Sequence, residues 1–473
     1  MEDLQYLFRR TNAHYRENRD IWERSRAAYR GGENYLDRAL IRHVSEIDLE
    51  FAERRKRAYY FNYPRKLAGL ITQCVFSSGP QRENVNIRLA EDFSRTGLRV
   101  DEVMRQVSTL LNIYGAAAMT VEMPFFHGEV DEERKQKERL RPAVQAISPL
   151  QVPDWGIGHN GELEWLITEE NVTLDQGPHQ PPLQTVRRKL FTRNEFIIYE
   201  RTPSTGKIVE VSRAKHNLGC VPALYLAEPE GYGLHGGHYF EDVVRISDAI
   251  LNNESEAQMN VVKQMFGLLV ISEGFARGVR PGRDNGANSG QEKFSHVLAR
   301  SAAIWESPEE RGISRYISPS GADTSLIRAE NQALKEELFD TIGMSLASSC
   351  RQAQTAESKA WDFHRVRQFL CGRADLLEQS ELRCWELMAG MDHSITIPKI
   401  SYNREFAVTD LQSSIASLTE LKRFSGGAEY RREVARAALF LLEKIKRIDP
   451  ARRKDILAEI ENWQNRNTEA ENV

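Results

Sequence analysis

Cysteine is scarce in this sequence of 473 residues, and its placement argues against two common frameworks. The five cysteines are scattered, with no CxxC pair and no Cys/His spacing typical of a metal site, so we expect neither a disulfide scaffold nor a structural zinc site. Long apolar runs are also missing: no stretch approaches the roughly 18 residues of a membrane span, and the first residues lack the apolar core of a signal peptide. These absences predict a protein without a membrane-spanning segment, in a reducing compartment such as a cytoplasm.

The signatures of common enzyme classes are missing as well. The sequence has no P-loop of the form GxxxxGKS/T, no GxSxG elbow, no HExxH helix and no DxD-like carboxylate cluster. The pair Glu336-Glu337 stands in a charged setting typical of a solvated helix face. Cys350 lies next to Arg351, but no histidine is near it in sequence to activate a nucleophile. We therefore expect no enzyme activity, no catalytic residue, no cofactor and no metal.

The charge balance is close to neutral. The formal net charge is −4, with 28% charged and 41% hydrophobic residues, which argues against a globally basic nucleic-acid binder but leaves a local basic surface open. A chain of this length is expected to form two or three domains. The run Glu53-Arg-Arg-Lys-Arg57 is interpreted as a solvated helix face in preference to a nucleic-acid patch, because Glu50 and Glu53 dilute its charge.

The stretch 323–391 organises the chain as a helix, a polar break and a longer helix. Apolar residues recur with a helical period from residue 323 to about 342, and Asp323 or Thr324 is expected to cap this helix. The break, 344–355, is small and polar. The second helix is predicted from Ala356 to Met391, with a bend invited by Gly372.

Ahead of this stretch the pattern changes from helical to β and back to helical. Helices are predicted at 63–76 and 89–114, a buried strand at 116–123, a charged exposed loop at 127–141 and a helix at 240–266. The glycine cluster 156–161 lacks the following helix of a dinucleotide-binding motif. The loop 229–238 is interpreted as a hinge in preference to a metal site, although His235 and His238 are three residues apart. Six short strands are predicted between these helices, at 143–147, 163–168, 186–191, 196–201, 208–211 and 223–226.

A compact insertion and a helical C-terminus complete the pattern. Within 267–320, strands are predicted at 268–271 and 302–305, and the glycine-rich loop between them carries Arg277, Arg280 and Arg283. This loop is either a mobile surface loop or an arginine cluster that faces phosphates or an acidic partner. A strand at 395–400 and helices at 411–424, 429–447 and 450–465 follow.

This order of elements resembles the portal (head–tail connector) proteins of tailed bacteriophages. Four stretches add to the resemblance: 29–35 (YRGGENY), 51–62 (FAERRKRAYYFN), 69–76 (GLITQCVF) and the turn 217–222 (NLGCVP). The resemblance covers essentially the whole chain. It implies a helix-rich α+β fold with the portal parts in this order: wing 1–239, stem helix 240–266, clip 267–322, stem helix 323–343, tunnel loop 344–357, a long bent helix and strand returning to the wing 358–405, and a helical crown 406–473.

The resemblance also implies a function, partners and sites. It implies a non-enzymatic ring of twelve subunits at a capsid vertex, through which double-stranded DNA passes without sequence preference during packaging and ejection. The implied partners are the terminase large subunit, a head–tail adaptor, the major capsid protein and scaffold, in the virion and in the host cytoplasm during assembly. Arg277, Arg280 and Arg283 would bind partners at the clip. The DNA-facing residues of the tunnel loop would be Ser345, Ser348, Ser349, Arg351, Gln352 and Gln354.

A tunnel loop with a single charge fits a conduit for DNA, because each neutralised phosphate adds affinity and would hinder sliding.

Two alternatives to the portal interpretation remain. A nucleic-acid-processing enzyme with an unrecognised active site would require metal-dependent cleavage or nucleotide turnover. A monomeric or dimeric scaffold would form no closed ring.

Overall fold

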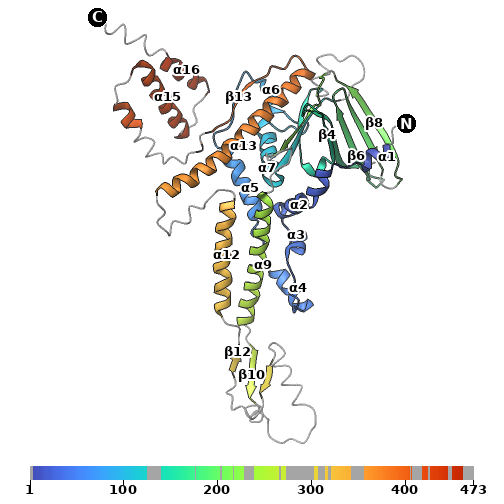
Figure 1. The fold of residues 1–473 in the computed structure, drawn as a ribbon, viewed down its shortest axis with the longest axis vertical. Coiled ribbons are helices and arrows are strands. Elements are labelled where there is room, and N and C mark those ends of the chain that lie inside the picture. The colour runs from blue at the N-terminus through green and yellow to red at the C-terminus, as the bar shows by residue number, and fades with distance from the viewer. Residues whose placement is uncertain are drawn as a thin grey trace. The chain divides into compact units, whose positions relative to one another are not determined.

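The structure is a computed structural model, and it combines helices and sheets as the sequence predicts (Figure 1). It describes residues 4–124, 140–175, 177–179, 181–202, 205–216, 218–227, 239–265, 268–272, 303–306, 315–317, 321–341, 356–404, 406, 418–423, 427–445 and 450–461. The chain divides into two compact units, Met1–Arg404 and Glu405–Val473. The α+β class is therefore confirmed.

Five helices open the first unit. The predicted helix at 63–76 is confirmed as α5, which Asn62 caps by accepting a hydrogen bond from the Arg65 backbone N–H at 3.0 Å, with Pro64 in the first turn. Asn62 adopts a left-handed backbone (φ 45°), which asparagine tolerates better than most residues. The five helices are α1 (Leu4–Arg9), α2 (Ala13–Arg30), α3 (Glu33–Ala39), α4 (Asp48–Arg57) and α5 (Tyr63–Val75).

The single helix predicted at 89–114 is wrong, because a turn divides it. The helix α6 (Ile87–Glu91) ends before this turn, and α7 (Val100–Tyr114) begins after it. In between, the Ser94 hydroxyl accepts hydrogen bonds from the backbone N–H groups of Thr96 and Leu98 at 3.2 and 2.9 Å. Gly97 then adopts φ 82°, a conformation that glycine reaches without strain. This local serine turn competes with helical hydrogen bonding.

Two antiparallel sheets follow. In the first, the order is β3-β2-β9, formed by β2 (Ala116–Glu122), β3 (Ala143–Ile147) and β9 (Ala223–Ala227). All seven residues of β2 are buried, as the sequence predicts. The second sheet is a five-stranded meander in chain order: β4 (Asp154–Ile157), β5 (Leu163–Leu174), β6 (Leu183–Thr192), β7 (Glu195–Arg201) and β8 (Ile208–Lys215), preceded by the 3-10 turn η1 (Pro149–Gln151). The six predicted strands are confirmed. Five of them, β5, β6, β7, β8 and β9, extend beyond the predicted bounds.

The strand β4 was not predicted, because its glycine reads as a turn. A Cβ built on Gly156 would lie 2.3 Å from the indole nitrogen of Trp165, which is its cross-strand partner. Glycine is therefore required for Trp165 to lie against this strand. A turn, and no helix, follows at residues 159–161, so the expectation that this cluster is not a dinucleotide-binding motif is confirmed.

A helix pair and a long helix complete the first unit. The helices α9 (Tyr239–Met265) and α12 (Gly321–Thr341) contact each other along their lengths (Figure 1). A three-stranded sheet lies between them in sequence, with the order β11-β10-β12: β10 (Leu268–Ser272), β11 (Ala303–Glu306) and β12 (Arg315–Ile317). The strand β12 was not predicted. The prediction that Asp323 or Thr324 caps α12 is wrong, because this helix already begins at Gly321.

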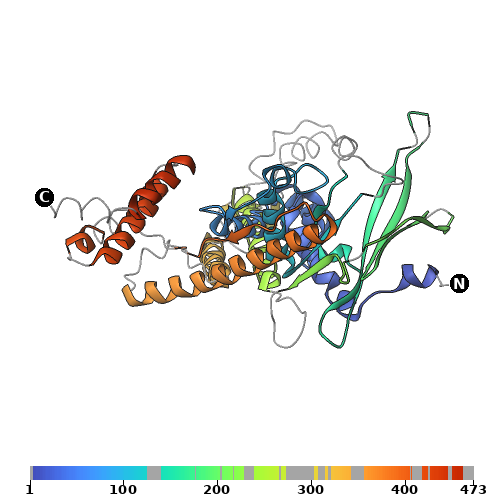
Figure 2. The same ribbon diagram turned by 90° about the horizontal axis from the view of Figure 1, so that it is seen from above.

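The predicted bounds of the longest helix are confirmed as α13 (Ala356–Met391), which is continuous through Gly372. It lies against α5, α7 and β2 (Figure 2). The strand predicted at 395–400 is shorter and later than expected: β13 (Lys399–Ser401) pairs antiparallel with β1 (Gln81–Glu83). In the second unit, residues 418–423, α15 (Ala428–Ile445) and α16 (Pro450–Glu461) are helical.

Candidate functional site

The residues predicted to contact DNA or partners lie outside the described residues. This holds for Ser345, Ser348, Ser349, Arg351, Gln352 and Gln354, for Arg277, Arg280 and Arg283, and for Cys350, His235 and His238. The elements that bracket them are described: α12 ends at Thr341 and α13 begins at Ala356, while β10 ends at Ser272 and β11 begins at Ala303. The candidate site is therefore built from α9, α12, α13 and the helices that hold them.

Polar side chains join α9 to α12. The Asn260 amide donates a hydrogen bond to the Thr324 hydroxyl at 3.2 Å, and the Asn331 amide donates one to Glu254 at 3.1 Å. Asn331 is only 2% exposed, so this bond is shielded from water. Among the described side chains of α12, the buried ones are Thr324, Asn331 and Leu338. Hydrogen bonds therefore contribute to the contact along with apolar packing.

The helix pair is acidic. Each of the two helices contains five acidic and two basic residues, so each carries a formal charge of −3. Glu330, Glu336 and Glu337 on α12 are exposed, which confirms the expected solvated setting of the last two. An acidic surface repels nucleic-acid phosphates at short range and does not hold them.

One face of α9 contacts the N-terminal helices through Asp248, Asn252 and Ser255. These residues are spaced by four and three positions, so they lie on the same side of the helix. Asp248 forms an ion pair with Arg24 of α2 at 2.6 Å and accepts a hydrogen bond from the Tyr35 hydroxyl of α3. Asn252, one turn later, accepts from the Ile41 backbone N–H at 2.8 Å. Burial, together with Tyr60 and Asp248, raises the pKa of Tyr35 well above its ordinary value, so this hydroxyl stays protonated and remains a donor.

Arg54 of α4 makes a further contact with this face of α9. Its guanidinium donates to the Ser255 hydroxyl of α9 at 2.9 Å, to the Ile41 carbonyl at 2.6 Å and to both oxygens of Glu46 at 2.9 Å. Arg54 is 3% exposed, so the prediction that the basic run 53–57 is wholly solvated is wrong at this position. The hydrogen bonds from Arg54 lower the pKa of Glu46, which keeps this carboxylate ionised.

A buried ionic cluster holds α13. Glu381 on α13 is fully buried and accepts from Arg82 of β1 at 2.5 and 2.9 Å and from the Tyr402 hydroxyl at 2.7 Å. Arg82 also pairs with Asp101 at 2.7 Å. A buried carboxylate is tolerated only when it is paired in this way, so the cluster fixes the position of α13 against β1 and α7.

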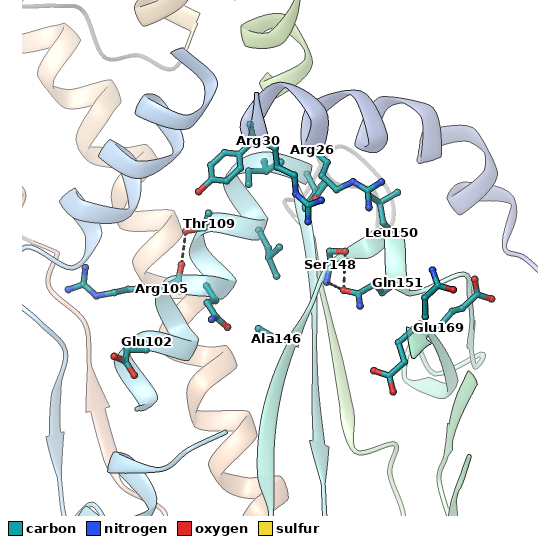
Figure 3. A pocket seen from close by; sticks show the side chains of 17 residues that line it. Arg26, Arg30, Glu102, Arg105, Thr109, Ala146, Ser148, Leu150, Gln151 and Glu169 are labelled. Atoms are coloured by element: carbon teal, nitrogen blue, oxygen red, sulfur yellow. Dashed lines mark hydrogen bonds between the residues drawn. The ribbon is translucent and has the colours of Figure 1, made fainter. Parts of the chain in front are cut away.

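Three arginines line an open cavity of about 840 Å³ between α2, α7 and the sheets (Figure 3). Arg26 and Arg30 lie one turn apart on α2, and Arg105 lies on α7. Within the part of the chain that the structure describes, none of the three forms an ion pair. Glu169 and Glu170 also line the cavity but are paired with other basic residues. Glu102 of α7 also lines the cavity, and in the described part of the chain its carboxylate accepts only the Arg99 backbone N–H. The lining therefore carries an excess of positive charge, which sequence periodicity did not reveal.

Several absences bear on chemistry. Among the described residues, no group of three or more His, Cys, Asp and Glu side chains is placed to hold a metal ion. The described cysteines are free, and burial raises the pKa of the Cys384 thiol, so it is not a reactive thiolate. In the same residues, no helix is long and apolar enough to span a membrane.

Comparison with known proteins finds similarity to solved structures at low sequence identity. No protein-family model and no curated protein sequence matches the chain. The neck of a native GTA particle computed with C12 symmetry matches 78% of this chain and 89% of its own chain, at 8% identity and a TM-score of 0.43. The neck of an empty GTA particle computed with C6 symmetry gives the same coverage at 8% identity and 0.42, and the virion of the native gene transfer agent (GTA) particle gives 10% and 0.42.

Proposed function

We propose that this chain is a phage portal subunit that assembles into a ring at a capsid vertex, through which double-stranded DNA is packaged and ejected. The proposal begins from the resemblance in the order of elements. The observation that carries it further is the helix pair: α9 and α12 pack together, enclose the β10–β12 sheet in sequence, and lead into α13, which is anchored by Glu381. In this proposal α9 and α12 are the stem, 267–322 is the clip, 344–357 is the tunnel loop, and 406–473 is the crown.

The charge of the helix pair supports a conduit in which DNA slides. A channel that neutralised many phosphates would gain affinity with each contact and would slow transport. Each of α9 and α12 carries a formal charge of −3 instead, and Glu330, Glu336 and Glu337 are exposed. A ring would repeat this charge around its axis. DNA would then pass without base readout, because it would meet neither a groove-reading helix nor a cationic clamp.

The remaining parts of the proposal follow from the same assignment. The clip would dock the terminase large subunit during packaging and the head–tail adaptor afterwards, with Arg277, Arg280 and Arg283 as the binding residues. Contacts with the major capsid protein and scaffold, a virion location, and assembly in the host cytoplasm belong to the same proposal. The subunit itself would be non-enzymatic and would use no cofactor, so the terminase would supply the energy of DNA translocation.

Negative-stain electron microscopy combined with native mass measurement of the purified protein tests the proposal. We expect closed rings of about twelve copies with a central hole, because head-to-tail interfaces of one kind close into rings. A protein that stays monomeric or dimeric at high concentration, in both low and high salt, would contradict it. Metal-dependent nuclease activity or nucleotide turnover by the same sample would favour the enzyme alternative.

If rings form, the tunnel-loop assignment has its own test. Replacing Arg351 with alanine is expected to impair DNA packaging while rings still form. Loss of ring assembly in this variant would instead make Arg351 a residue of the subunit interface.

A further inference from the structure

One end of the cavity between α2, α7 and the sheets is cationic. Arg26 and Arg30 lie one turn apart on α2, on the side of the cavity that η1 borders (Figure 3). Both are exposed, and within the described part of the chain neither guanidinium forms an ion pair or a hydrogen bond. Figure 3 places Arg105 and Glu102 away from them, on α7. There the Arg105 guanidinium lies over the Phe76 ring, 4.7 Å from its centroid. We call the α2 side of the cavity the Arg26–Arg30 end.

A nearly buried hydroxyl adds a donor at this end. Tyr114 also lines the cavity and is 6% exposed, and its hydroxyl forms no hydrogen bond with any residue that the structure describes. Burial raises the pKa of Tyr114 to about 12, while the positive charges of Arg26 and Arg30 act to lower it. The hydroxyl is therefore protonated at neutral pH and lies close enough to both arginines for their charges to act on it. A polar group at this level of burial normally has a partner, so this donor is open to a ligand.

Gln151 of η1 offers a second neutral donor. Its Oε1 accepts hydrogen bonds from the backbone N–H and the hydroxyl of Ser148, at 3.4 and 3.3 Å, which holds the amide in place. The Nε2 group then keeps both of its N–H donors, and among the described residues it has no partner. Figure 3 shows Gln151 beside Ser148, on the same side of the cavity as Arg26. Two guanidinium groups, a phenol and an amide therefore supply donors at this end.

The acidic residues of the lining are paired or stand apart from this end. Glu169 pairs with Arg188 at 2.6 Å, and Glu170 pairs with Arg187 at 3.4 Å. Glu102 stands on α7, on the side of the cavity away from α2 (Figure 3). A small anion at the Arg26–Arg30 end would meet an excess of positive charge. A long polyanion such as a DNA duplex would also run along these carboxylates, which repel it.

We propose that the Arg26–Arg30 end of this cavity binds a phosphate group, either free or carried by a small molecule. Two guanidinium groups match the charge of a phosphate dianion, and the Tyr114 and Gln151 donors serve its remaining oxygens. A carboxylate has one charge and two oxygens, so it would leave donors unused. The cavity, at about 840 Å³, also has room for the rest of a phosphorylated small molecule. This site is separate from the proposed channel and does not depend on ring formation.

Isothermal titration calorimetry of the full chain tests the proposal, with inorganic phosphate, pyrophosphate and adenosine monophosphate as probes at constant ionic strength. Arg26→Gln combined with Arg30→Gln removes the cationic end. Arg16→Gln combined with Arg38→Gln is the matched control, because it removes the same charge at two exposed positions that lie outside the cavity lining. We expect one site per chain in the wild type and in the control, and binding about 100-fold weaker or more in the cavity variant.

The hydroxyl has a finer test. Tyr114→Phe keeps the buried ring and removes only the donor, so it is expected to weaken phosphate binding by about fivefold without lowering the melting temperature. The arginine substitutions are at exposed positions, and circular dichroism and thermal melting would verify folding. If the double cavity variant misfolds, Arg30→Gln alone replaces it, with Arg38→Gln alone as its control.

The outcomes separate the possible sources of the phosphate. Tighter binding of adenosine monophosphate than of inorganic phosphate would assign the site to a phosphorylated small molecule, and equal binding would assign it to free phosphate. Absence of binding by all three probes at about 10 mM would overturn the proposal. Equal weakening by the cavity variant and the control would do so too, because it would show general electrostatic attraction. Duplex DNA that binds through Arg26 and Arg30 when none of the small probes binds would overturn it as well, in favour of a surface for the DNA backbone.

Discussion

The core around β2 and the α9–α12 pair are stabilised in different ways. All seven residues of β2 are buried, and α7 beside it buries nine residues, most of them apolar. In α12, by contrast, two of the three buried side chains that the structure describes are polar. The core around β2 is thus mostly apolar and enclosed, whereas the helix pair buries more polar side chains and exposes isolated apolar ones such as Leu326. This difference is expected if the sides of the pair are completed by neighbouring copies and by the contents of a channel.

The largest effect should come from the apolar core. Trp22 on α2 is 1% exposed, and its indole N–H donates to the Tyr114 carbonyl at 3.1 Å. Trp22→Ala is expected to lower the free energy of unfolding by about 3–5 kcal/mol, because it leaves a cavity and an unpaired carbonyl. Urea denaturation followed by circular dichroism measures the change. A decrease in the free energy of unfolding of less than about 1 kcal/mol would show that packing around Trp22 does not dominate the stability of this core.

A smaller loss is expected at the ionic cluster that holds α13. Arg82→Met leaves Glu381 buried without its cation, at a cost of about 3 kcal/mol. Lys399→Met on the paired strand β13 is the matched control, since the pair Lys399–Glu83 is exposed on both sides and contributes about 0.5 kcal/mol or less. Equal effects of the two substitutions in thermal denaturation would mean that Glu381 does not position α13.

Substitutions in the α9–α12 pair should change stability less. Asn331→Ala removes the buried hydrogen bond to Glu254 and is expected to cost about 1–2 kcal/mol, measured locally as faster amide hydrogen exchange in α12. Gln332→Ala, at the exposed neighbouring position, is the control, with an expected change under about 0.5 kcal/mol. If Asn331→Ala left exchange in α12 unchanged, apolar contacts would dominate this pair too.

The smallest effect has the opposite sign. A Cβ on Gly372 in α13 would meet nothing within 4 Å, so Gly372→Ala is expected to stabilise the chain by about 1 kcal/mol through helix propensity. Gly390→Ala in the same helix would place a Cβ 2.6 Å from the Leu218 side chain and should gain less or lose stability. Loss of ring assembly in Gly372→Ala, despite a higher melting temperature, would instead place this glycine at a contact between copies.

The sequence predicted the parts of the fold that depend on local periodicity. The bounds of α9 and α13 were predicted to within one residue, and six of the meander and central strands were located from their alternation and turns. The division between α6 and α7 was missed, because the Ser94 turn has the same apolar spacing as the helices around it. The strand β4 was missed because Gly156 makes room for Trp165 on the neighbouring strand β5, and the sequence alone does not show this contact.

Long-range polar contacts were beyond what the sequence could predict. From the sequence, Arg54 is one member of a solvated basic run. In the structure it is buried, and it donates a hydrogen bond to Ser255, 201 residues away. Asp248, Asn252 and Ser255 share the polar spacing of any exposed helix face, and only the tertiary structure shows that α2, α3 and α4 cover them. The three-arginine cavity likewise combines positions on α2 and α7 that are unrelated in sequence. The predicted loop residues at 277–283 and 345–354 remain predictions.

A cryo-electron microscopy reconstruction of the purified assembly tests the central claim most directly. We predict a closed ring whose channel is lined by α9 and α12, with the acidic side chains of Glu330, Glu336 and Glu337 facing the channel. Residues 344–357 are expected at its narrowest point. A reconstruction in which α9 and α12 lie on the outer surface, or in which no channel runs through the assembly, would contradict the account.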